Sequence, residues 1–173
     1  ALLFIMIESR TDLLALVDAS GGGAATCGDD TCSAGEDPTS CPSDCPPCGI
    51  IAATGGIVDD GDACFSAGGP QAFIRVATDA GQGGDLRWTN TTASALEANY
   101  GTWELFLAEG GRYLVEIYTD ASYARSTQAS YQVTHDGRRD DVIIDQQAAD
   151  GWQALGTYVF ASGGGQRLHV GDN

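Results

Sequence analysis

Basic residues are scarce in this chain. It has 8 Lys and Arg against 24 Asp and Glu, which gives a formal net charge of −16 at pH 7. Proteins that bind nucleic acid neutralise phosphates with clustered basic side chains, and basic segments are also what anionic membrane surfaces attract. The composition therefore argues against nucleic acid or an anionic membrane as a partner. A chain this acidic is suited to high solubility and to divalent cations.

A long apolar run is also missing. A membrane-spanning helix needs about 20 apolar residues in succession. Residues 1–7 (ALLFIMI) are apolar, but the polar residues 8–12 (ESRTD) interrupt them before LLALV begins at residue 13. We therefore expect no membrane span and interpret residues 1–20 as a β-prone N-terminal segment.

The motifs of common catalytic and nucleotide sites are absent. The two histidines, His135 and His169, fall in predicted strands without a serine or cysteine nucleophile motif beside them. No GxxxxGK, HExxH or GxGxxG sequence occurs. Nothing in the sequence selects a carboxylate pair for glycoside hydrolysis, so that alternative stays open. We predict that the protein is not an enzyme.

Glycine is abundant, with 24 residues, whereas methionine occurs once. Short strands joined by tight turns produce this balance, and long helices do not. Alternating patterns predict strands within residues 73–77, 85–88, 103–107, 113–118, 130–135, 142–145, 158–161 and 167–170. Their even spacing and glycine-rich corners indicate an all-β fold, an antiparallel β-sandwich.

All six cysteines lie in one short segment, at Cys27, Cys32, Cys41, Cys45, Cys48 and Cys64. An even number at this density predicts disulfides and an oxidising, extracellular compartment. The Cys-Pro-Pro-Cys sequence at 45–48 also has zinc-ligand spacing. We favour disulfides because acidic and proline residues crowd the cysteines and no histidine lies near them.

Three connectivities are open to the first four cysteines, and we favour two pairs among them. The last two cysteines bracket the junction with the main domain, so we pair them as well. The predicted disulfides are Cys27–Cys41, Cys32–Cys45 and Cys48–Cys64.

Composition divides the chain into three parts. Residues 1–20 are the N-terminal strand segment, and residues 21–48 are a glycine linker followed by a cysteine-rich acidic knot. Residues 49–173 hold the predicted strands and form the main sandwich domain.

Three stretches of the main domain resemble a known bacterial family. They are GTWELFLAEGGRYLVEIYTD from residue 101, ASYQVTHDGRRDDVIIDQ from residue 129 and GWQALGTYVFASGGGQRLHVGDN from residue 151. Their specific parts are YxVxHxG, the Asp145–Gln146 pair and GWxxLGxYxF. They resemble the golvesin C-terminal-like domain, an extracellular β-sandwich also described as carbohydrate-binding-like. The resemblance covers about residues 57–173 and implies a binding or adhesion module.

In the last of these stretches Trp152, Leu155 and Tyr158 flank Gly156. A bulky ring can close one end of a sandwich against a tight turn at a glycine. Sugar binding needs rings displayed on a surface, whereas the alternation places most of these side chains inside. We expect them to belong to the core.

The sequence departs from the family at its end. The family domain closes with a strand of the form apolar-apolar-x-Asp-Ala, but this sequence stops at LHVGDN. The segment LLALVDA at residues 13–19 has the missing pattern. A sandwich that lacks a strand has an open edge and a gap in its core. We therefore predict that the N-terminal segment supplies the missing strand.

The function depends on whether the N-terminal strand completes the sandwich of its own chain or that of a neighbouring subunit. A stiff knot would direct the segment away from its own domain, so we predict donation to the next protomer and a head-to-tail helical or linear filament, an extracellular structural homo-oligomer. Two alternatives stay open: a carbohydrate-binding or adhesion module that binds glycans, and pairing within the same chain. The assembly side chains would be Leu3, Phe4, Ile5, Ile7, Leu14 and Leu16.

The knot sequence CGDDTCSAGEDPTSCPSDC resembles a small CGDxxC…CPxDC motif of secreted bacterial proteins. Its cross-links would bring carboxylates together, and such groups repel one another unless a cation joins them. Calcium takes six to eight oxygen ligands in flexible geometry. We expect Ca²⁺ here, with a solvated acidic loop as the alternative; the ligands would be Asp29, Asp30, Glu36, Asp37 and Asp44.

An N-x-T sequon occurs at residues 90–92, on a predicted loop after Trp88. Asn90 is therefore a candidate glycosylation site in a secreted protein. Sequons also arise by chance, and many bacteria never use them.

Overall fold

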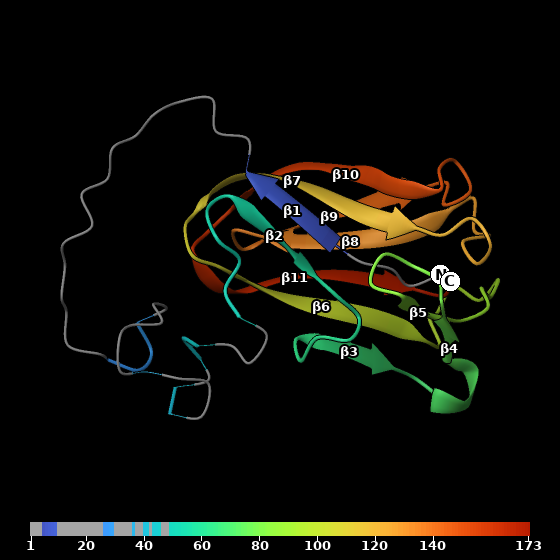
Figure 1. Ribbon diagram of the computed structural model, residues 1–173, viewed down its shortest axis with the longest axis horizontal. Helices are drawn as coiled ribbons and strands as arrows, with labels where there is room; N and C mark the ends of the chain where they lie inside the picture. The colour runs from blue at the N-terminus through green and yellow to red at the C-terminus, as the bar shows by residue number, and fades with distance from the viewer. Residues whose placement is uncertain (1–4, 10–25, 30–35, 37–39, 42, 46–48) are drawn as a thin grey trace.

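A computed structural model describes residues 5–9, 26–29, 36, 40–41, 43–45 and 49–173 of the chain. Within these residues two antiparallel sheets lie face to face as two layers (Figure 1). This arrangement confirms the predicted all-β fold. None of the described residues form a helix with the length and apolar character needed to cross a membrane.

The four-stranded sheet has the order β10-β7-β1-β2, with β10 (Gly151–Phe160), β7 (Gly111–Thr119), β1 (Ile5–Ser9) and β2 (Gly55–Val58). The five-stranded sheet has the order β3-β6-β11-β8-β9, with β3 (Phe65–Gly68), β6 (Tyr100–Leu107), β11 (Gly163–Gly171), β8 (Ala129–His135) and β9 (Arg138–Ile144). A two-stranded ribbon and a short 3₁₀ helix complete the fold: β4 (Arg75–Thr78), β5 (Asp85–Trp88) and η1 (Gln71–Phe73).

The core lies between the two sheets and follows the predicted alternation. Trp103 and Leu105 of β6 are fully buried, as are Val115 and Ile117 of β7. Their neighbours along each strand are partly exposed, because successive side chains of a strand point to opposite faces. The outward side chains of the five-stranded sheet are therefore free to form a surface.

Strand β1 lies inside the four-stranded sheet of its own chain, between β2 and β7 (Figure 1). Ile5 is opposite Val58 on one side and Ile117 on the other. Residues 5–9 of the N-terminal segment thus pair within their own chain, which was an alternative to donation, and donation to a neighbour has no support here. Ile7 also belongs to β1, whereas the remaining predicted assembly residues and the pattern at 13–19 lie outside the described residues: Leu3, Phe4, Leu14 and Leu16.

The most specific family motif joins the two sheets. The Nδ1 of His135 on β8 lies 2.8 Å from the carbonyl oxygen of Val159 on β10, and its Nε2 lies 2.9 Å from Asp140 Oδ2. The Nε2 of Gln146 donates a hydrogen bond of 2.8 Å to the Oη of Tyr131. These motif residues satisfy buried polar groups, so their role is structural.

Gly156 lies at a β-bulge inside β10, so the tight turn expected there is wrong. Its φ is 146°, and the register of β10 against β7 shifts at this point. A Cβ at Gly156 would lie 3.0 Å from the Oη of Tyr158. Leu155 is buried, and Trp152 and Tyr158 are half-buried against hydrophobic clusters, which confirms that these side chains serve packing.

Candidate functional site

A groove with a volume of about 700 Å³ lies on the outer face of the five-stranded sheet. It forms because the outward side chains of this sheet are polar and no further layer of the described residues covers them. The strand register sets these side chains in rows across the sheet. One row consists of Ser66, Thr102, His169, Gln132 and Asp141.

Tyr100 provides an aromatic ring at one end of the groove. Its cross-strand neighbours are Gly68 on β3 and Gly171 on β11. A Cβ at Gly68 would overlap the Tyr100 ring, and one at Gly171 would meet the carboxylate of Glu97. The Tyr100 ring therefore lies over Gly68, and the Glu97 side chain lies over Gly171, because neither glycine has a side chain to displace them.

His169 connects the floor of the groove to its wall. Its ring centroid lies 5.2 Å from that of Tyr100. Its Nδ1 is 2.9 Å from the Oγ1 of Thr102, and its Nε2 is 2.9 Å from the Oε2 of Glu97. A proton on Nε2 would be donated to Glu97, and the Thr102 hydroxyl would then donate to Nδ1. This chain of hydrogen bonds fixes the ring of His169.

The C-terminal residues hold the segment that forms the wall. The carboxylate of Asp172, which is buried, accepts hydrogen bonds from the Ala98 N–H at 2.8 Å and the Asn99 Nδ2 at 3.1 Å. The carbonyl of Asp172 also accepts a hydrogen bond of 2.6 Å from the Thr92 N–H. Residues 92–99 are thereby fixed to the end of β11, beside the groove.

The other end of the groove carries charges of both signs. Arg139 donates from Nε and Nη2 to the Oδ1 of Asp141, at 3.2 and 3.1 Å. The corresponding row across the sheet consists of Glu104, Arg167, Thr134 and Arg139. The floor of the groove therefore offers both hydrogen-bond donors and hydrogen-bond acceptors. None of these residues stands out in the sequence as part of a binding site, and only the strand alternation could have shown that they share a face.

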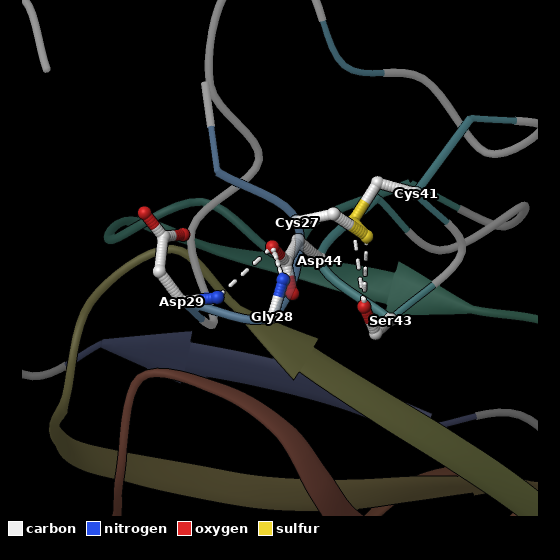
Figure 2. Close-up of a disulfide and its surroundings, with 6 residues drawn as sticks. All are labelled: Cys27, Gly28, Asp29, Cys41, Ser43 and Asp44. Atoms are coloured by element: carbon white, nitrogen blue, oxygen red, sulfur yellow. Dashed lines mark hydrogen bonds between the residues drawn. A yellow bond between two sulfur atoms is a disulfide. The ribbon is translucent and has the colours of Figure 1, made fainter. Parts of the chain in front are cut away.

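The cysteine-rich segment contains the predicted disulfide between Cys27 and Cys41 (Figure 2). Cys45 and Cys64 are also disulfide-bonded, and the other two cysteines, Cys32 and Cys48, lie outside the described residues. None of the cysteines that the structure describes is a free thiol, so they offer no ligand for zinc.

Asp44 of the expected calcium set stabilises the backbone next to this disulfide. Its Oδ2 accepts hydrogen bonds from the N–H groups of Gly28 at 2.7 Å and Asp29 at 3.2 Å. Figure 2 shows the Asp29 carboxylate directed away from that of Asp44. The described residues do not gather three of the expected carboxylates, and Asp30 and Asp37 lie outside them. Calcium binding by this segment, Glu36 included, stays a prediction.

A second acidic group, which the sequence analysis did not single out, lies in the loop between β2 and β3. Asp60 is buried, and its Oδ2 accepts a hydrogen bond of 2.7 Å from the Arg87 N–H. Burial raises the pKa of Asp60 to about 6, and the nearby carboxylates of Asp59 and Asp85 act in the same direction. The Arg87 N–H and the positive charge of Arg87 oppose this shift.

Comparison with known proteins places this architecture in a family. Residues 75–173, from β4 to the C-terminus, match the golvesin C-terminal domain. The chain belongs to this family. Its golvesin C-terminal domain therefore contains the groove floor supplied by β6, β8, β9 and β11, whereas β1, β2, β3 and the cysteine-rich segment precede the matched region.

A solved structure, that of a Paenibacillus xanthan lyase, shares the fold of the golvesin-type sandwich. The two chains are 22% identical with a TM-score of 0.56 over 67% of this chain. The match spans 11% of the lyase chain, so the likeness concerns one module and not the activity of the whole enzyme. No curated protein matches this chain.

Proposed function

We propose that this chain is an extracellular, non-catalytic carbohydrate-binding module that holds a saccharide in the groove over its five-stranded sheet. The observation that carries this proposal is the groove itself, in which the Tyr100 ring, seated over Gly68, lies beside a floor of hydrogen-bonding side chains.

The groove supplies both kinds of contact that a sugar requires. A pyranose ring has a weakly apolar C–H face, which packs on an aromatic ring, and hydroxyl groups around its edge. Tyr100 offers the ring, while Thr102, Gln132 and Arg167 offer donors and acceptors. The volume of about 700 Å³ falls in the range of natural ligand sites, roughly 300–1,000 Å³.

The comparisons support this proposal over a filament. The matched family is the one whose resemblance implies a binding or adhesion module, and the structural neighbour is by its name a lyase of the polysaccharide xanthan. The disulfides favour an oxidising, extracellular compartment. The pairing of β1 within its own sheet removes the open edge on which strand donation depended.

The groove contains three side chains in the order of a hydrolase triad, but the backbone around them argues against catalysis. Thr102, His169 and Glu97 are connected in the order hydroxyl, imidazole, carboxylate, as in a hydrolase triad. Thr102 lies in the middle of β6, which pairs with β3 on one side and β11 on the other. The backbone N–H groups around it therefore belong to sheet ladders and are not available to an oxyanion. We assign these three residues to positioning the ligand.

Affinity electrophoresis of the full chain against gels that contain neutral or acidic polysaccharides tests the proposal. We expect at least one polysaccharide to retard the protein and Tyr100→Ala to weaken binding by about tenfold. Phe73→Ala is the matched control, because Phe73 is an exposed ring outside the groove. An unretarded protein, or equal losses in the two variants, would contradict the proposal.

A further inference from the structure

A second cavity, with a volume of about 350 Å³, lies between the loop that follows β5 and the loop that follows β7. It shares no lining residue with the groove: its walls are Trp88, Thr89, Asn90, Thr91, Ser122, Tyr123, Arg125 and Ser126. We propose that this cavity is a second saccharide site and that it binds an acidic sugar, a hexuronate residue.

Two aromatic rings form the apolar part of this cavity. The ring centroids of Trp88 and Tyr123 are 5.9 Å apart, with an angle of 46° between their planes. Both rings are half-buried against the cluster around Leu86, which limits their motion. The guanidinium of Arg75, the cross-strand partner of Trp88, lies 4.7 Å from the Trp88 ring centroid and fixes it further. Trp88 and Tyr123 both line the cavity, and the face of an aromatic ring is the surface on which the C–H face of a sugar packs.

Arg125 gives the cavity its charge. Its side chain is exposed, and its backbone carbonyl accepts a hydrogen bond of 2.6 Å from the Nε2 of Gln147, which fixes the loop. Among the described residues, no carboxylate lines the cavity and none lies within ion-pair distance of the Arg125 guanidinium. In the groove, by contrast, Arg139 is paired with Asp141, and the carboxylates of Glu97 and Glu104 belong to the lining.

The overall charge makes this arrangement selective. On a chain with a net charge of −16, most of the surface repels an anion. A cavity that Arg125 lines and that no described carboxylate lines is a local exception, and a guanidinium binds a carboxylate through two parallel hydrogen bonds. A hexuronate combines that carboxylate with a ring for Trp88 and Tyr123 and hydroxyls for the Thr and Ser side chains.

The probe is sodium glucuronate, titrated at constant ionic strength into the ¹⁵N-labelled full chain made in a host that adds no N-glycan to Asn90. The indole N–H of each tryptophan gives a separate NMR signal. We expect the Trp88 signal to move, while that of Trp103, which is fully buried, stays in place. Glucose and acetate are the comparison ligands, and we expect each to bind at least about tenfold more weakly.

Arg125→Gln should weaken glucuronate binding by about tenfold. Arg138→Gln is the matched control, because it removes the same charge from an exposed arginine outside the cavity. Tyr100→Ala should leave glucuronate binding unchanged, which separates this site from the groove. A Trp88 signal that does not move, equal binding of glucose or acetate, equal losses in the two arginine variants, or loss of binding in Tyr100→Ala would each overturn the proposal.

Discussion

The ring of Tyr100 occupies the space that a side chain at position 68 would need, and Gly68 is its direct cross-strand partner. The aromatic surface of the groove therefore depends on a glycine that lies 32 positions before Tyr100 in the chain. A substitution at position 68 should therefore weaken binding indirectly, by moving the Tyr100 ring, although residue 68 itself does not line the groove.

Gly68→Ala should displace the Tyr100 ring and weaken polysaccharide binding by about three- to tenfold. The ring is the end of a side chain on an outer face, so it can turn away, and the melting temperature should change by no more than ~3 °C. Gly56→Ala is the control, because a Cβ at Gly56 would make an ordinary contact of 3.6 Å with Ile51. Affinity electrophoresis and thermal melting measure the two effects, and a loss of affinity in the control of the same size would contradict the explanation.

Asp60 should make the stability depend on pH between about 4 and 6. Its pKa is raised from 3.8 to about 6 in the folded protein, mainly by burial. The folded state then binds more protons than the unfolded state in this range, so this group's contribution to stability falls as the pH rises through 6.

Asp60→Asn should therefore raise the free energy of unfolding at pH 7.5 by about 1–3 kcal/mol and have little effect at pH 4. Urea denaturation at both pH values measures the change, and Asp150→Asn, at an exposed position, is the control. A variant that is less stable than the parent at pH 7.5 would show that the Arg87 N–H contact outweighs the cost of burying the charge.

Removal of residues 1–19 should destabilise the sandwich, because β2 and β7 each lose the strand that lies between them. We expect the melting temperature to fall by more than ~10 °C, and a peptide of residues 1–19 should restore part of the loss. Because β1 pairs within its chain, the intact protein should run as a monomer in size-exclusion chromatography with light scattering. Concentration-dependent oligomers of the intact protein, absent from the truncated form, would instead favour strand donation.

Calcium should protect the cysteine-rich segment if the carboxylates at positions 29, 36 and 44 take part in a site. Limited proteolysis in Ca²⁺ and in EDTA, followed by peptide mapping, compares cleavage within residues 27–48 with cleavage in the sandwich. We expect faster cleavage of the segment in EDTA and an unchanged sandwich. Identical cleavage in both conditions would contradict a calcium site in this segment and leave Asp44 a structural role, to which its contacts with the Gly28 and Asp29 N–H groups belong.

The sequence was sufficient for the features that depend on local order. Alternation of period two put Val115 and Ile117 on one face of a strand, because in a strand each side chain's face follows from its position alone. The structure shows that this face is the core. Among the first four cysteines the sequence left three connectivities open, and the structure contains Cys27–Cys41, one of the pairs that we favoured. The bulge at Gly156 was mistaken for a turn, because a glycine with positive φ serves both.

Only the tertiary structure could assemble the two sites. Tyr100 lies between Gly68 and Gly171, and Trp88 lies beside Tyr123, although these residues are far apart in the chain. Their proximity depends on the order and register of strands, which non-local hydrogen bonds and core packing fix together. The same holds for β1: its apolar sequence indicates that it must pair, but its place between β2 and β7 is set by the gap that the remaining strands leave in the sheet.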